Sequence, residues 1–251
     1  MPTIIDSFLY NVSFLLIILY LDLINFSKFN LIFATAFNAA APLRSVVDEA
    51  ALAEVFGTLA VFVDEIWTKS YGNPKELPTT EKAKIKPEYP YALTKLLGEQ
   101  IMLHWSNVYD LPVTSLRLFN VYGTRSRTSG TYGAVFGVFL AQKLAKKAFT
   151  VVGDGSQTRD FTYVSDVVRA IICAVKSSKI GEIYNVGSGQ PVSVNRIVKL
   201  LGAEKITYIP KRPGEPDKSL ASINKIKKEL GWEPKIKIKQ GVEELLKNIN
   251  F

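Results

Sequence analysis

Helical and strand-like segments alternate along most of the chain. Apolar residues three and four apart predict a helix from Tyr91 to about Val108, and the run PVTSLRLF at 112–119 predicts a buried strand. The same alternation then gives a helix at 133–147, a strand at 149–152, a helix at 165–178 with Ser165 as its N-cap, and a strand at 182–187. Alternation of this kind is typical of an α/β fold with a mostly parallel sheet.

The N-terminal part of the chain is dominated by apolar residues. Residues 30–37 predict a buried strand, and the Ala, Leu and Val periodicity of 46–67 predicts a helix. Residues 7–21 carry no charge, but about 20 apolar residues are needed to span a bilayer, and this run is shorter and contains Asn11 and Ser13. It also lacks the basic leading region and the small-residue cleavage site of a secretory signal. We therefore favour a buried segment of a core over a membrane span.

The composition fits a globular protein with a small anionic substrate. A chain of 251 residues with 47% hydrophobic residues can bury one core, or one core with a smaller lobe. The net charge is +8, and lysines concentrate toward the C-terminus, where KIKKEL and PKIKIKQ mix them with apolar residues but not with aromatic ones. A nucleic-acid surface usually interleaves its cations with aromatic rings. We therefore predict a solvated amphipathic surface and no nucleic-acid partner.

Cysteine and histidine each occur once. Cys173 cannot form an internal disulfide, and its apolar neighbours in sequence indicate a core position in a reducing, cytoplasmic compartment. His104 alone excludes a histidine-based metal site and leaves little scope for a Ser–His–Asp triad. We expect His104 to be a surface or hydrogen-bonded helix residue, and we expect no metal.

A tyrosine and a lysine lie four residues apart in YALTK, at Tyr91 and Lys95. This spacing puts both side chains on one face of the predicted helix. A nearby lysine charge stabilises phenolate, which brings a tyrosine toward use as a base at neutral pH. Two exposed side chains on an amphipathic helix would have the same spacing. The second match, Tyr71 to Lys75, contains Gly72 and Pro74 and is predicted to be a turn.

Polar and basic residues follow the predicted strands. Asn120 and, five residues later, Arg125 lie just beyond the carboxyl end of the strand at 112–119, where open α/β sheets bind ligands. Arg159 follows the glycine turn of GDGSQTRDF, and Arg212 lies in the loop IPKRPGEP. Single loop arginines are usually solvated, but two of them could clamp a diphosphate.

The order of these stretches resembles a known family. PYALTKLLGE, RLFNVYG, GDGSQTRDFTYVSDV, YNVGSG and RPGEP followed by LGWEPK are similar, as an ordered set over about residues 71–247, to the extended short-chain dehydrogenase/reductases, in particular the NAD-dependent nucleotide-sugar epimerases and dehydratases. The resemblance implies an incomplete Rossmann-like parallel sheet with helices on both faces. It also implies a partial dinucleotide-binding domain at 30–120, and a substrate lobe at 121–251 whose strands return to the sheet near 149–152 and 182–186.

The resemblance implies the catalytic roles. Tyr91 would take the proton from a sugar hydroxyl while hydride passes to the nicotinamide, and Lys95 would hold the nicotinamide ribose and lower the tyrosine pKa. The family's catalytic Ser/Thr falls on Trp67, so the adjacent Thr68 is the weaker candidate for that role.

The resemblance also implies binding roles. Asn120, Arg159 and Arg212 match positions that contact the substrate diphosphate, and Glu215 stands where an Asp usually contacts the nucleotide ribose. The expected ligands are NAD and a nucleoside-diphosphate sugar, and the helix at 91–108 is the expected face of a homodimer.

The sequence departs from the family at its cofactor loop. The family opens with a Gly-x-x-Gly-x-x-Gly loop that binds the NAD pyrophosphate at a helix N-terminus, but the first glycine here is Gly57. We therefore expect an N-terminally truncated or disturbed member, in which residues 1–29 are a separate hydrophobic segment and NAD binding is weak or absent. The expected function is that of a UDP-glucose 4-epimerase-like enzyme. The alternatives are a non-catalytic remnant that binds nucleotide sugar or is held at a membrane, and a nucleotide-sugar 4,6-dehydratase.

Overall fold

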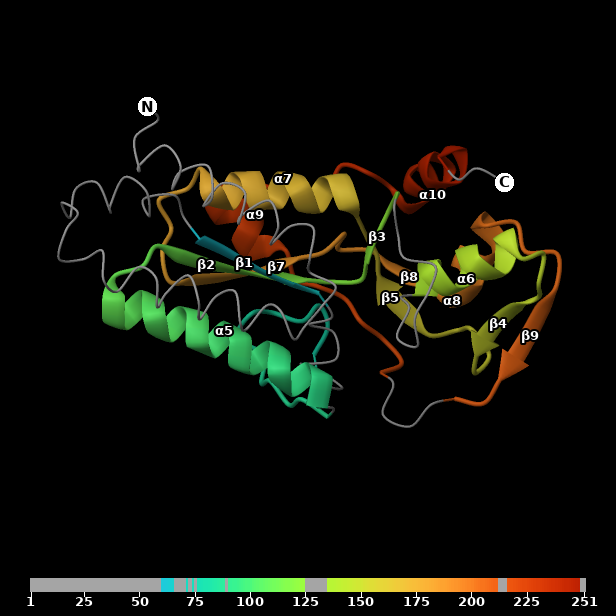
Figure 1. Cartoon of the computed structure of the whole chain (residues 1–251), viewed down its shortest axis with the longest axis horizontal. Coiled ribbons are helices and arrows are strands. Elements are labelled where there is room, and N and C mark those ends of the chain that lie inside the picture. Colours follow the sequence, from blue (N-terminus) through green and yellow to red (C-terminus); the bar gives the residue numbers. More distant parts are fainter. Residues whose placement is uncertain are drawn as a thin grey trace, which may run out of the picture. The chain divides into compact units, whose positions relative to one another are not determined.

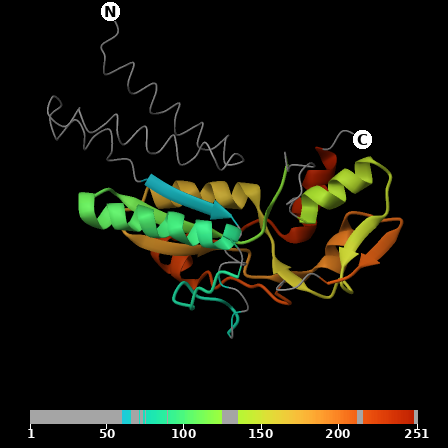
Figure 2. The same cartoon turned by 60° about the horizontal axis from the view of Figure 1, so that its bottom comes forward.

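The chain divides into two units, residues 1–58 and 59–251. The computed structural model describes residues 60–65, 71, 74, 76–88, 90–124, 135–211 and 216–248, all of which belong to the second unit (Figures 1 and 2). The predicted hydrophobic segment at 1–29 and the predicted strand at 30–37 lie outside the described residues.

A three-stranded parallel sheet forms the centre of the described part. Its strands are β1 (Ala60–Glu65), β2 (Val113–Leu118) and β7 (Glu182–Val186), in the order β1-β2-β7. Every residue of β2 is buried, as expected for the middle strand of a sheet covered on both faces. Helix α5 (Pro90–Tyr109) lies on one face, and α7 (Val164–Val175) and α9 (Asn224–Leu230) lie on the other (Figure 1). The predicted α/β fold with a Rossmann-like parallel sheet is confirmed.

Two local predictions were wrong. Residues 60–65 form a parallel strand rather than the end of a helix at 46–67, because the β-branched and aromatic run Val-Phe-Val favours a strand and all six residues find partners on β2. Ser165 lies within α7 and does not cap it, because the helix already begins at Val164 and Tyr163 takes the N-cap position.

A second group of elements forms a smaller lobe. It contains α6 (Val135–Leu144), β4 (Phe149–Val152), α8 (Val194–Leu200), β9 (Ile206–Ile209) and α10 (Ile238–Lys247). Strand β4 pairs in parallel with β9, so the expectation that 149–152 returns to the main sheet was wrong. The reason is packing: the side chains of Phe149 and Val151 join the core of the lobe, together with Phe139 and Ile197.

Short strands connect the main sheet with the smaller lobe. Strand β3 (Val121–Tyr122) pairs with β6 (Thr162–Tyr163), and β5 (Thr158–Asp160) pairs antiparallel with β8 (Pro191–Ser193). Residues 182–186 pair with β2 in the main sheet. The exact boundaries of the two functional domains stay a prediction.

The C-terminal segment is anchored on α7. The indole nitrogen of Trp232 donates to the backbone carbonyl of Asp166 at 3.0 Å. The buried carboxylate of Asp166 accepts the backbone N–H groups of Lys235 and Ile236, both at 3.0 Å. These bonds hold the connection between α9 and α10 against the start of α7.

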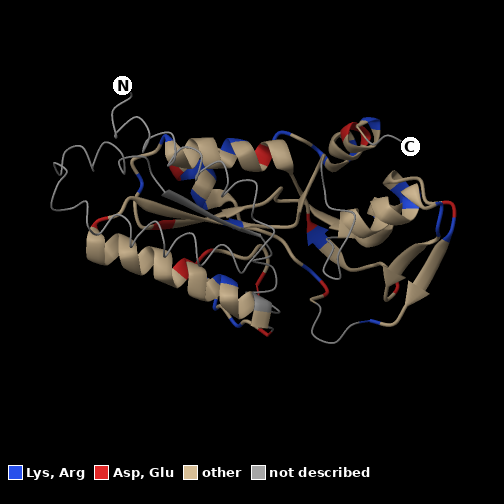
Figure 3. Ribbon diagram, viewed as in Figure 1, with Lys and Arg blue, Asp and Glu red and all other residues tan. Residues whose placement is uncertain are grey.

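Figure 3 marks the positions of the charged residues along the ribbon of the described part. The lysines of the C-terminal PKIKIKQ stretch are exposed while Ile236 and Ile238 are partly buried, which confirms the predicted amphipathic surface. His104 is exposed, and Cys173 is half-buried against the core of the main sheet. No helix within the described ranges is long and apolar enough to cross a membrane. The same ranges contain no cluster of three potential metal ligands among His, Cys, Asp and Glu.

Candidate functional site

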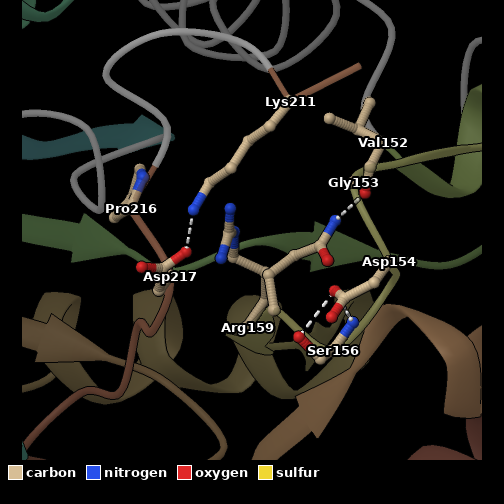
Figure 4. Close-up of a pocket in the computed structure, with 9 residues that line it drawn as sticks. Val152, Gly153, Asp154, Ser156, Arg159, Lys211, Pro216 and Asp217 are labelled. Carbon is tan, nitrogen blue, oxygen red and sulfur yellow. Dashed lines mark hydrogen bonds and ion pairs between the residues drawn. The ribbon is translucent and has the colours of Figure 1, made fainter. Parts of the chain in front are cut away.

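A pocket of about 390 Å³ opens in the smaller lobe, beside the turn that follows β4. Its size lies within the range typical of sites for small molecules. Figure 4 shows the side chains that line it, which are Val152, Gly153, Asp154, Ser156, Gln157, Arg159, Lys211, Pro216 and Asp217.

The turn after β4 forms one wall of the pocket. Gly153 and Gly155 have φ angles of +64° and +75°, a region that side chains with a Cβ rarely adopt. The Asp154 carboxylate accepts the backbone N–H of Ser156 at 2.9 Å and its hydroxyl at 2.6 Å. These hydrogen bonds, first that from the Ser156 hydroxyl and then that from its backbone N–H, lower the pKa of Asp154.

Arg159 enters the pocket from β5 and is only 7% exposed. Its Nη1 donates to the carbonyl of Thr158 at 3.0 Å. The strand is fixed on both sides, because β8 pairs with it and the N–H of Thr158 donates to the carbonyl of Asp217 at 2.9 Å. A permanently charged guanidinium is therefore held on a rigid strand at the wall of a pocket.

Asp160, the next residue of β5, points away from Arg159 because side chains alternate along a strand. Its buried carboxylate accepts N–H and O–H groups of Ser188 at 2.6 and 2.5 Å, and the N–H groups of Gly189 and Ala221 at 3.1 and 3.0 Å. Burial raises the pKa of Asp160 although these hydrogen bonds act in the opposite direction. Asp160 thus ties β5 to the loop after β7 and to residue 221.

The structure connects Asn120 with the strand that carries Arg159. The Asn120 amide donates to the backbone carbonyl of Asp160 at 3.2 Å. Asn120 follows the carboxyl end of β2, as predicted. Arg125, Arg212 and Glu215 lie outside the described residues, so their roles stay predictions.

Helix α5 brings the Tyr–Lys pair to the same edge of the sheet. The chain leaves α5 at Tyr109 and enters β2 at Val113, so helix and strand run antiparallel and the first turn of α5 lies where β2 ends (Figure 1). The backbone of Tyr91 is in that first turn, and Lys95, partly buried, follows one turn later. The Tyr91 side chain and Thr68 lie outside what the structure describes.

A buried ion pair attaches α5 to β2, one turn beyond Lys95. The Glu99 carboxylate accepts two hydrogen bonds from Arg117, at 2.6 Å to Oε1 and 2.9 Å to Oε2. The hydroxyl of Ser115, also on β2, donates to the same carboxylate at 2.7 Å. Both charged groups are almost fully buried, so each compensates the charge of the other within the protein.

The same arginine holds Tyr71. Arg117 Nη1 donates to the Tyr71 hydroxyl at 2.6 Å, and this hydroxyl donates to the Asn185 side chain on β7 at 3.0 Å. Burial raises the pKa of Tyr71 to about 12, which keeps the phenol neutral. Tyr71 is therefore a neutral link between β2 and β7, and not a second candidate base.

Sequence reasoning missed this buried network. Its signal was a charged residue, Arg117, inside a strand that otherwise reads as buried. A buried arginine requires an acidic partner. Glu99 lies at the same helical spacing as Tyr91 and Lys95, four residues further along, and was the available candidate.

Comparison with known proteins shows where this architecture occurs. A family model described as GDP-mannose 4,6 dehydratase matches residues 68–245. A UDP-glucose 4-epimerase of Mycolicibacterium smegmatis is 31% identical over 211 residues, which cover 82% of this chain and 67% of that protein.

Solved structures agree with the sequence matches. The UDP-glucose 4-epimerase of Thermotoga maritima, determined with UDP-glucose, has a TM-score of 0.70 and 32% identity, covering 79% of this chain and 67% of the other. The UDP-glucuronic acid 4-epimerase of Bacillus cereus, determined with UDP-glucuronic acid and NAD, has a TM-score of 0.68 and 30% identity, covering 79% and 64%.

The matches cover part of the relatives. The chain spans 58% and 59% of the lengths of two further curated relatives, from Methanocaldococcus jannaschii and Bacillus subtilis. The family model nevertheless covers most of this chain, including α5, the pocket and the C-terminal anchor on α7. The chain belongs to the extended short-chain dehydrogenase/reductases, in the family of NAD-dependent nucleotide-sugar epimerases and dehydratases.

Proposed function

We propose that this chain binds a nucleoside-diphosphate sugar and acts on it as a UDP-sugar 4-epimerase. The observation that carries the proposal is Arg159, a nearly buried guanidinium on a rigid strand at the wall of a pocket of small-molecule size. Its charge does not depend on pH, and its fork of donors suits phosphate oxygens. The structural relatives from Thermotoga maritima and Bacillus cereus were determined with UDP-glucose and UDP-glucuronic acid.

The proposed chemistry uses the edge of the sheet where α5 begins. NAD, when bound, supplies the nicotinamide that takes up and returns a hydride. Tyr91 removes the proton from the sugar hydroxyl that is oxidised, and returns it when the hydride comes back on the other face of the sugar. Lys95 binds the nicotinamide ribose and, as a neighbouring cation, lowers the pKa of Tyr91.

The residues at this edge fit the nicotinamide end of NAD better than its pyrophosphate end. Lys95 is partly exposed at the carboxyl edge of a parallel sheet, where such cofactors bind. Within the described ranges no counterpart of the glycine-rich pyrophosphate loop occurs, and the chain has no glycine before Gly57. The second candidate function is a protein that binds nucleotide sugar at the pocket of Arg159 without turnover.

Binding of UDP should depend on Arg159. The change Arg159→Ala is expected to weaken UDP binding by about 1–3 kcal/mol, the range for hydrogen bonds to charged groups, and the parent affinity should fall as salt rises. Isothermal titration calorimetry measures both effects, with Lys228→Ala on the exposed face of α9 as a control that removes one charge outside the pocket. Equal UDP affinities of the parent and Arg159→Ala would refute the proposed site.

We further propose that α5 forms a homodimer interface. Leu93, Leu97, Ile101 and Val108 are apolar side chains on this helix that are 45–53% exposed. Leu93, Leu97 and Ile101 follow one another at one-turn spacing and form a stripe that a second copy of the chain would cover.

A charge in this stripe should dissociate the dimer. The parent is expected to sediment as a dimer at micromolar concentration and Ile101→Glu as a monomer, because the new carboxylate would be buried without a partner. Analytical ultracentrifugation measures the mass. The matched control is Ile172→Glu, an equally apolar and 46% exposed position on α7, which should leave the dimer intact. A parent that sediments as a monomer contradicts this proposal.

A further inference from the structure

An ion pair lies within the pocket of Arg159. The ammonium group of Lys211 contacts the carboxylate of Asp217, and both residues line the pocket (Figure 4). The two side chains are 55% and 73% exposed. The second cation of the described pocket wall is thus paired with a carboxylate of the protein itself.

The backbones that carry this pair are fixed, whereas its side chains are accessible. The carbonyl of Asp217 accepts the N–H of Thr158 at 2.9 Å, beside Arg159 on β5. Lys211 comes two residues after β9, whose last residue, Ile209, accepts the N–H of Gly153 at 2.8 Å. Lys211 can therefore change partners by rotation about side-chain bonds alone, without a movement of the strands.

The ion pair of Lys211 and Asp217 contributes little to stability, and its ammonium group can bind a phosphate in place of the carboxylate. Exposed ion pairs contribute little to stability, since water and salt screen them. A carboxylate oxygen and a phosphate oxygen are both anionic acceptors for an ammonium group. A diphosphate that enters the pocket beside Arg159 offers Lys211 several such oxygens in place of one carboxylate.

The other acidic residue of the pocket has different partners. The Asp154 carboxylate accepts both donor groups of Ser156 and belongs to the turn after β4. Asp154 and Asp217 thus place the same charge in one pocket, but Asp217 contacts the ammonium group of Lys211 directly, whereas for Asp154 the same lysine is a nearby charge that contributes to its lowered pKa. Replacing each aspartate in turn therefore distinguishes how direct pairing with Lys211 and how the negative charge of the pocket affect nucleotide affinity.

We propose that Lys211 is a diphosphate-binding residue and that Asp217 is its internal competitor. In the free protein the Asp217 carboxylate contacts the ammonium group of Lys211. When a nucleotide binds, its diphosphate replaces this carboxylate as the partner of Lys211. The proposal rests on the proposed nucleotide-sugar site, and it adds a residue of the protein that competes with the ligand and so lowers the affinity of the site. The ligand class is a nucleoside diphosphate, and the uridine moiety is not required for the exchange.

The proposal predicts opposite effects of the two partners. Asp217→Asn should tighten UDP binding about two- to fivefold, and Lys211→Gln should weaken it about two- to fivefold, the range for one exposed ion pair. When Lys211 is already replaced by Gln, the further change Asp217→Asn should raise the UDP affinity no more than Asp154→Asn raises it in the parent protein. Asparagine keeps the backbone carbonyl that anchors residue 217 on β5, so the fold is retained.

Calorimetric titration of the parent, the two single variants, the double variant and Asp154→Asn with UDP tests this directly, and inorganic pyrophosphate is the second probe. The same pattern with both probes supports the exchange. Equal gains for Asp217→Asn and Asp154→Asn would overturn it, because pocket charge alone would then explain the change. If Arg159→Ala weakens UDP binding but Lys211→Gln does not, the proposed exchange at Lys211 is wrong while the proposed nucleotide-sugar site stands. If the parent binds neither UDP nor pyrophosphate, both proposals are wrong.

Discussion

Replacing Arg117 by methionine is expected to lower the free energy of unfolding by about 3–5 kcal/mol, the cost of breaking a buried ion pair by removing one partner. The change leaves the Glu99 carboxylate buried against β2 with only the hydroxyl of Ser115 as a donor from that strand. It also removes the donor that Tyr71 accepts from. Urea denaturation monitored by circular dichroism measures the loss.

Two controls separate the buried charge from lost volume. The double variant Glu99→Leu/Arg117→Met removes both charges and should lose less stability than the sum of the single changes, because neither partner is left unpaired. Lys225→Met breaks the ion pair with Glu182, whose side chains are 28% and 42% exposed, and should cost under about 1 kcal/mol. A loss for Arg117→Met as small as that for Lys225→Met would contradict the assignment of a buried pair.

The change Tyr91→Phe is expected to lower kcat for UDP-glucose epimerisation about 10²- to 10⁴-fold, the usual contribution of a positioned acid–base group. Phenylalanine keeps the ring and removes only the hydroxyl that would exchange a proton with the sugar. Steady-state kinetics with added NAD measures the change.

Tyr71→Phe is the matched control for this substitution. Tyr71 is buried, its pKa is raised to about 12, and its hydroxyl bonds to Arg117 and Asn185, so it has no role in proton transfer. The Tyr71→Phe protein should keep its kcat per folded molecule. Equal losses in the two variants would refute Tyr91 as the base, and a parent without turnover would favour the non-catalytic binding protein.

The sequence predicted elements well wherever periodicity is local. Helix α5, strand β2 and strand β4 lie within three residues of their expected bounds, because each has its own apolar pattern. The partner of β4 could not be predicted in this way. It is β9, 54 residues beyond the end of β4, and the pairing depends on how the smaller lobe packs. Residues 60–65 were misread because a short apolar run suits a helix and a buried strand equally.

For the candidate site, too, the sequence predicted what depends on local pattern and missed what depends on long-range packing. Asn120 and Arg159 were singled out because they follow strands, and the structure joins them through the carbonyl of Asp160. The partners of buried and paired charges were not predicted, since Glu99 reaches Arg117 across 18 positions and the pairing appears only when the helix lies on the sheet. The Lys211–Asp217 pair was missed because the sequence does not indicate which acid of a loop a lysine will contact.

The bond between Glu99 and Arg117 has a geometric consequence for α5. A slip of this helix by one residue along its axis would move it 1.5 Å and turn every side chain by about 100°. A two-pronged bond between a carboxylate and a guanidinium tolerates neither displacement, because both oxygens and both nitrogens must stay in line. The ion pair therefore fixes both the position of α5 along its axis and its rotation relative to β2. The first two turns of the helix, whose backbone carries Tyr91 and Lys95, are held at a fixed height and angle over the end of the sheet before any ligand arrives.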